Sequence, residues 1–187
     1  VNVDEELSEE KELVQRAEND MLTGVLNKKT MEKRVSLMLK NRGDKYVIFY
    51  MVDLDNFKNV NDTLGHIYGD QAIVETAQCL NKVFANQDCI GRLGGDEFAV
   101  CVSYQAFDEQ GLLEFIGKKA QEICAGNRRT YTDNAASVSI TSSIGVAYAP
   151  DMGDSFTELY TQADCALYYS KANGKDQYHI YSPKDDN

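Results

Sequence analysis

The segment "KYVIFYMVDLD", residues 45–55, is the strongest indicator of the fold class, because it is almost wholly apolar until Asp53. A continuous run of β-branched and aromatic residues predicts a central strand that is covered on both faces. Side chains alternate along a strand, so Asp53 and Asp55 face the same side if the strand continues through them. The segment therefore predicts a buried strand that ends in two carboxylates at one edge of a sheet.

Residues 92–100, "RLGGDEFAV", predict a hairpin beside that strand. Apolar runs flank the turn, and Gly94 and Gly95 supply the flexibility that a tight turn needs. A turn does not need Asp96 and Glu97 side by side. A Gly-Gly-Asp turn by itself is more often only a turn, so the function of these acids depends on what lies next to them.

Acids from the two segments are expected to meet, because the hairpin brings Asp96 and Glu97 toward Asp53. Carboxylates that converge from separate strands form an oxygen site suited to Mg²⁺, and burying them without a cation would cost free energy. Mg²⁺ usually binds through one or two carboxylates plus phosphates, so a phosphate-bearing substrate is expected. Gly94 and Gly95 would let that substrate approach the backbone closely.

The remaining pattern predicts an α+β fold. Amphipathic helices are expected at residues 27–43, 69–85, 107–127 and 155–175, and further strands at residues 137–149 and 177–182. The order from Tyr46 contains the βαββαβ plan of a ferredoxin-like sheet, mainly antiparallel, with helices on one face. Residues 127–136 are expected to form a mobile loop.

Residues 1–19 predict a charged helix ahead of a single domain at residues 20–187. Leu7, Val14 and Met21 are spaced by seven, although Glu10 interrupts the adjoining seam position. One interpretation is the end of a coiled-coil linker from an upstream sensory domain. The other is a solvated helix packed on its own domain. An upstream domain is expected in either case, because the chain begins with Val1.

The composition argues against a nucleic-acid-binding protein and against a metal or redox site built from cysteines. The chain has 187 residues, 43% of them hydrophobic, and a net charge of −11. This acidity argues against non-specific binding to nucleic acid, and neither a nucleic-acid partner nor direct membrane contact is expected. The five cysteines show no metal or redox spacing. Buried free thiols and a cytoplasmic location are therefore expected, with a membrane anchor elsewhere in a longer protein left open.

Several segments in order resemble the GGDEF domains, the bacterial diguanylate cyclases. They are "DMLTGVLNKKTME", "VDLDNFKNVNDTLGHIYGD", "GRLGGDEFAV", "SSIGVA" and "ADCALYYSKANGK". The resemblance implies a palm-like nucleotidyl-cyclase fold. It also implies an enzyme that joins two GTP molecules into cyclic di-GMP and releases two pyrophosphates. Each domain would hold one GTP, so a homodimer is implied.

The resemblance also implies roles for individual residues. Asp53, Asp96 and the carbonyl of Leu54 match ligands of Mg²⁺, with Mn²⁺ as an alternative. Glu97 matches an acid that either binds the metal or helps to deprotonate the ribose 3′-hydroxyl. The GTP-binding positions are Gly94, Gly95, Asn56, Phe57, Lys58, Asn61, Asp70, Lys171 and Lys175. Asn61 and Asp70 would read guanine, and the lysines and the amides of Asn56 and Phe57 would face phosphates.

Two departures from the family pattern stand out. Lys175 occupies a position where arginine is common, so a point charge replaces a bidentate fork. Many members carry an inhibitory product site, Arg-x-x-Asp, ahead of the signature; here Ala85 replaces the arginine and Asp88 remains. No product inhibition through this site is therefore expected.

Three rival functions stay open beside the cyclase. The first is a catalytically silent GTP-binding module that acts in regulation or dimerisation; the intact Asp53, Asp96 and Glu97 disfavour it. The second is a cyclase with a different base choice, which Asp70 disfavours because a carboxylate accepts hydrogen bonds from guanine N1–H and N2–H₂. The third is a purely structural dimerisation unit, which would need none of these acids.

Overall fold

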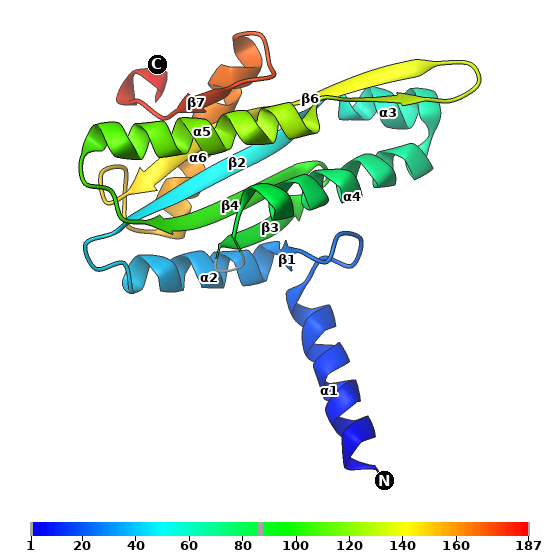
Figure 1. Ribbon diagram of the computed structural model, residues 1–187, viewed down its shortest axis with the longest axis horizontal. Coiled ribbons are helices and arrows are strands. Elements are labelled where there is room, and N and C mark those ends of the chain that lie inside the picture. Colours follow the sequence, from blue (N-terminus) through cyan, green and yellow to red (C-terminus); the bar gives the residue numbers. More distant parts are fainter. Residues whose placement is uncertain (1, 86–87, 187) are drawn as a thin grey trace.

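The computed structural model describes residues 2–85 and 88–186 of the chain (Figure 1). Its helices are α1 Val3–Glu18, α2 Lys28–Lys40, α3 Phe57–Leu64, α4 His66–Val83, α5 Glu109–Asn127, α6 Phe156–Ala172 and the 3₁₀ turn η1 Pro183–Asp186. Its strands are β1 Leu26–Asn27, β2 Tyr46–Asp55, β3 Cys89–Gly94, β4 Glu97–Tyr104, β5 Arg129–Thr132, β6 Ser137–Ala149 and β7 Tyr178–Ile180.

The sheet confirms the α+β prediction and the central place of β2. Its strand order is β1-β3-β4-β2-β6-β5, with β7 beside β6. β2 is antiparallel to both β4 and β6. Only the short pairs β1 with β3 and β6 with β7 are parallel, so the described sheet is mainly antiparallel.

Helices cover both faces of the sheet, so the expectation of helices on one face is wrong. Ile48, Tyr50 and Val52 of β2 pack with α4 and α5 in one core. Their neighbours Val47, Phe49 and Met51 point the other way and pack with α2 and α6. The reason is visible in β2 itself: all six of these side chains are fully buried, and a strand that is apolar on both faces needs cover on both.

Three short elements were not expected from the sequence. β5 lies within the residues predicted as a mobile loop, and that prediction is wrong: Arg129–Thr132 pair with the start of β6. α3 follows β2 directly, and Phe57, Val60 and Leu64 stand at helical spacing in an otherwise polar segment. β1 has only two residues and joins the edge of the sheet through β3.

The N-terminal helix α1 projects away from the domain (Figure 1). None of its residues is buried, and Leu7 and Val14 are about half exposed, at 48% and 50%. The interpretation in which this helix packs on its own domain is therefore wrong, and the coiled-coil interpretation stays a prediction. Among the described residues, no helix is both long and apolar enough to cross a membrane.

Candidate active site

Three acids meet where β2 ends and β4 begins. Asp53 lies directly opposite Glu97 in the antiparallel register of these strands. The backbone N–H of Leu54 donates to the carbonyl of Asp96 at 3.3 Å, which holds the hairpin turn against the end of β2. The expected convergence of Asp53, Asp96 and Glu97 is thus present in the structure.

Asp53 is the least satisfied of these carboxylates. Its Oδ2 atom lies 3.1 Å from the ammonium of Lys171, whereas Oδ1 is buried and has no hydrogen-bond partner among the described residues. Burial, and then the nearby charge of Asp96, raise the pKa of Asp53 to about 6, against a partial offset from Lys171. An unpartnered carboxylate oxygen beside a second acid is what a bound cation would satisfy.

The raised pKa makes the stability of the metal-free protein depend on pH. A carboxyl whose pKa is higher in the folded state stabilises the fold fully below its unfolded value, near 3.8, and this stabilisation is lost as the pH rises through about 6. Asp53→Asn carries no such charge. Between pH 4 and pH 7, its free energy of unfolding should rise relative to wild type by about 1 kcal/mol or more. Urea unfolding in chelator-treated buffer measures this; a constant difference would contradict it.

Glu97 is partly buried beside α6. The hydroxyl of Tyr160 donates to its Oε1 at 3.5 Å, a long contact. Burial, followed by the charges of Asp53 and Asp164, raises the pKa of Glu97. A carboxyl in this setting holds a proton more readily than an exposed one does, which suits the proton-accepting one of the two roles that the sequence left open.

Arg92, on β3 of the hairpin, links the turn to the segment that follows α1. Its Nε donates to the carbonyl of Gly95 at 2.9 Å, and its Nη1 donates to Asp20 at 3.2 Å. Gly95 has a φ of +43°, a conformation that glycine adopts without strain. Asp20 belongs to the turn that follows α1. This link between the start of the domain and the hairpin turn was not predicted from the sequence.

The N-terminus of α3 supplies backbone donors next to the acids. Asn56 precedes the helix with a φ of +67°, and its side-chain amide donates to the carbonyl of Ser139 at 3.1 Å. Phe57 and Lys58 are the first two residues of α3, and Lys58 is exposed. The N–H groups of a first helical turn lack partners within the helix and favour anions. The phosphate-facing prediction for these residues fits this position.

The two residues predicted to read guanine lie on adjoining helices. Asn61 is on α3, and its side chain packs directly against Gly69 of α4, where any side chain would overlap it. Asp70 follows Gly69 and is exposed. Gly69 therefore allows the close packing of α3 on α4 that brings the two predicted positions together.

Lys171 joins the acids from the end of α6. Its ammonium lies 3.1 Å from Asp53 and 3.3 Å from Asp55, although these residues are more than a hundred positions away in the sequence. Lys175 is exposed in the turn that follows α6. The sequence predicts that Lys171 faces phosphates, and it predicts no role for Asp55. The ion pairs of Lys171 with Asp53 and Asp55 were not predicted.

A family model described as diguanylate cyclase, GGDEF domain, matches residues 17–177. The chain belongs to the GGDEF domain family. Among its relatives is the bifunctional diguanylate cyclase/cyclic di-GMP phosphodiesterase MucR of Pseudomonas aeruginosa, 33% identical over 91% of this chain and 24% of its own length. The cyclic di-GMP phosphodiesterase PdeR of Escherichia coli is 30% identical over 90% of this chain, again with 24% of its own length.

Solved GGDEF structures share the fold. The coiled coil and GGDEF domain of DgcB from Caulobacter crescentus, in complex with c-di-GMP, superposes with a TM-score of 0.82 and 28% identity. The match covers 94% of this chain and 92% of that one. The chain spans about a quarter of the length of the curated relatives named above.

Asp88, which the sequence predicts to be left over from a product-binding motif, makes a local hydrogen bond. The carboxylate of Asp88 accepts a hydrogen bond from the backbone N–H of Ala85 at 3.0 Å. The two residues between them lie outside the described residues. Burial raises the pKa of Asp88. The expectation of no inhibitory site here stays a prediction.

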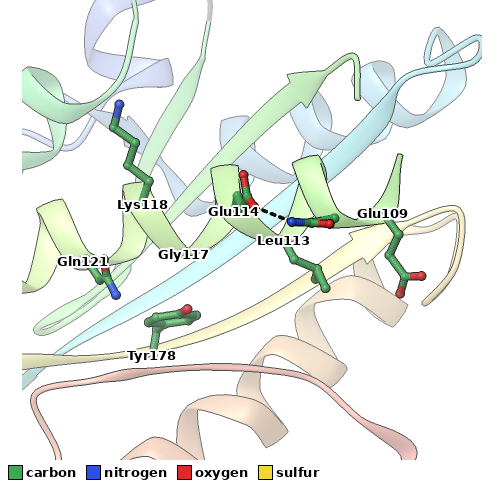
Figure 2. Close-up of a pocket in the computed structure, with 8 residues that line it drawn as sticks. Glu109, Leu113, Glu114, Gly117, Lys118, Gln121 and Tyr178 are labelled. Carbon is green, nitrogen blue, oxygen red and sulfur yellow. Dashed lines mark hydrogen bonds between the residues drawn. The ribbon is translucent and has the colours of Figure 1, made fainter. Parts of the chain in front are cut away.

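A groove of about 590 Å³ lies away from the acids, between α5 and β7 (Figure 2). Tyr178 reaches its floor beneath Gly117, where a Cβ atom would come within 2.6 Å of the tyrosine hydroxyl. Glu114 and its neighbours on α5 form the other wall (Figure 2). None of the predicted site residues lines this groove. The candidate active site is instead the cluster of acids at the end of β2 and the start of β4.

Proposed function

We propose that this domain is a diguanylate cyclase that condenses two GTP molecules into cyclic di-GMP and two pyrophosphates. The observation that carries the proposal is the meeting of Asp53, Asp96 and Glu97 around a buried carboxylate oxygen that has no partner. Such an arrangement is costly without a cation and a ligand. Retaining it favours an active site over a purely structural unit.

Asp53, Asp96, Glu97 and the carbonyl of Leu54 are the groups that would hold Mg²⁺ or Mn²⁺. Among the described residues, no group of three or more His, Cys, Asp or Glu side chains is placed so that it could hold a metal ion by itself. In the proposal, phosphates of the substrate therefore complete the coordination. When bound, a divalent cation neutralises charge that develops on phosphate oxygens.

The protein's own groups would bind and orient the nucleotide. Lys171, Lys58 and Lys175 attract the triphosphate, and the amides of Asn56 and Phe57 donate to it. Asn61 and Asp70 select guanine through hydrogen bonds to its edge. Positioning and charge stabilisation of this kind account for most of the catalysis in phosphoryl transfer.

Each bond-forming step joins the ribose 3′-oxygen of one GTP to the α-phosphorus of the other. The bond from that phosphorus to the β-phosphate bridge breaks, pyrophosphate leaves, and the 3′-hydroxyl loses its proton. Glu97 either accepts that proton or binds the metal, in which case the proton passes to water. Since one domain holds one GTP, two domains must face each other. In the same proposal, α1 connects the domain to an upstream sensory region, and the domain works in the cytoplasm.

A silent GTP-binding module is the second candidate. Two observations favour it: a relative named as a phosphodiesterase carries a similar segment, and Lys175 stands where an arginine is common in the family. A module of this kind would bind GTP through the same residues and leave it unchanged.

The test is to incubate the protein with GTP and Mg²⁺ at high protein concentration and to identify the products by mass. Cyclic di-GMP would support the cyclase. Tight GTP binding without product, even when two domains are held together by a fused dimeric coiled coil, would favour the silent module. A cyclic dinucleotide that contains adenine, formed from mixed GTP and ATP, would favour altered base choice.

Product inhibition is expected to be weak, because Ala85 removes the planar cation that would pair with phosphate and stack on guanine. Initial rates with and without added cyclic di-GMP measure this, and they should agree within about twofold, because the ion pair and the stacking that an arginine would supply are missing. Strong non-competitive inhibition that disappears in Asp88→Ala would contradict the prediction.

A further inference from the structure

Asp55 is the most completely bonded carboxylate at the candidate site. It is only 3% exposed. Its Oδ1 accepts from the hydroxyl of Ser143 at 2.7 Å and from Lys171 at 3.3 Å. Its Oδ2 accepts from the hydroxyl of Thr141 at 2.7 Å and from the backbone N–H of Asp176 at 3.1 Å. Four donors from β6, α6 and the turn after α6 thus converge on one side chain.

This bonding separates Asp55 from Asp53, two residues earlier on the same strand. Among the described residues, Asp53 has a buried oxygen without a hydrogen-bond partner. Each oxygen of Asp55, in contrast, accepts hydrogen bonds from two donors. A cation would have to displace at least one of them to bind Asp55. Asp53 is therefore the carboxylate open to a metal, and Asp55 is committed to the protein.

The turn after α6 depends on these bonds. Lys175 and Asp176 have φ values of +62° and +49°, in the left-handed region that residues with side chains avoid. Four contacts hold them there. Asp55 accepts from the Asp176 N–H, and Arg128 lies 2.8 Å from the Asp176 carboxylate. The Lys175 N–H donates to the carbonyl of Ser170 at 3.0 Å, and the Lys175 carbonyl accepts from the side-chain amide of Gln177 at 3.1 Å.

We infer that Asp55 is a positioning residue, which fixes the Lys171 ammonium and the Lys175–Asp176 turn where the triphosphate of GTP binds. The inference rests on the proposed function. Lys171 bridges Asp53 and Asp55 in the structure. When a cation occupies Asp53, Asp55 still holds the ammonium, which can then face a phosphate without leaving its place. Asp55 in this way presents two cations, Lys171 and Lys175, from one anchor.

Hydrogen exchange on the ligand-free protein tests the anchor directly. In Asp55→Asn, the side-chain amide cannot accept from all four donors, so the Asp176 amide should exchange at least tenfold faster than in wild type. The amide of Val100 in β4, which is paired with β2, is the internal reference and should be unchanged. An unchanged Asp176 amide would overturn the inference. Thr141→Val, which removes one donor and keeps the charge, should give a smaller increase and covers the case in which Asp55→Asn does not fold.

Nucleotide binding tests the consequence. In the presence of Mg²⁺, the affinity of the protein for the α,β-methylene analogue of GTP should be at least tenfold lower in Asp55→Asn than in wild type. Lys171→Met should also weaken it, and Asp55→Asn with Lys171→Met should bind no more weakly than Asp55→Asn alone, because contacting residues that act as a unit are not additive. Losses that multiply would overturn the inference.

A matched control separates positioning from general loss of stability. Thr76→Val removes an equally buried hydrogen-bonding side chain of α4, away from the acids. It should lower stability and leave the affinity within twofold of wild type; a tenfold loss in this control would count against the inference. If the wild-type protein itself binds no analogue, the proposed function fails, while the exchange of the Asp176 amide still decides whether Asp55 anchors the turn.

Discussion

Cyclic di-GMP formation by Asp96→Ala is expected to fall by about a thousandfold or more, the scale of losing a main electrostatic contact to the transition state. Asp96 stands in the turn whose carbonyl pairs with Leu54, beside the unpartnered oxygen of Asp53. Without it, the site loses one of the three carboxylates proposed to hold the cation. Product formed per unit time, resolved by mass, is the measurement.

Folding and charge can be separated from chemistry in this experiment. Asp96→Ala removes a negative charge beside Asp53, so its free energy of unfolding without metal should not fall below that of wild type. Asp44→Ala removes an equal charge from an exposed loop and should retain wild-type activity. Full cyclase activity in a folded Asp96→Ala protein would contradict the assignment of the site.

The largest effect on stability is expected from Gly145→Val, where β6 meets α6. A Cβ atom at Gly145 would overlap the carbonyl of Ala163 and the backbone N–H of Leu167. Both are backbone atoms of a helix, which cannot rotate away as a side chain could. The free energy of unfolding should fall by about 3 kcal/mol or more, at the upper end for overpacked cores. Urea unfolding monitored by circular dichroism gives this value.

Gly43→Ala is the matched comparison, because it separates lack of space from backbone strain. A Cβ at Gly43 would meet no atom within 4 Å, although the φ of +61° disfavours a side chain. Its cost should be only about 1 kcal/mol. Equal losses at the two positions would mean that α6 can move away from β6, contrary to the packing described above.

The elements that could be predicted from sequence are those with strong local patterns. β2 is apolar on both faces over its buried length, and the hairpin carries glycines in its turn. Both elements could therefore be predicted, and the structure confirms them. α3 was missed because its start is set by the left-handed Asn56, which has no capping hydrogen bond. β5 was missed because its four residues are ordered by pairing with β6, and pairing between strands is not a local property of either.

The same distinction applies to the site. Asp53, Asp96 and Glu97 could be brought together from two neighbouring strands, because the hairpin connection limits how they lie. Asp55 could not be given a role, since its partners Thr141, Ser143 and Lys171 come from elements far along the chain. The alternation of β2 does place Asp55 on the side of Asp53, and that was the one available signal.

The exposure of α1 has an energetic consequence. With no residue buried, residues 3–18 contribute little to the cooperative melting of the sheet and its helices. A helix of this length without tertiary contacts is marginal in water. Its helical content should therefore rise with protein concentration if a second copy packs beside it, while the melting of the domain stays where it is. The chain is thus expected to melt as two thermodynamic units: the packed domain, and an exposed helix whose order would depend on a second copy.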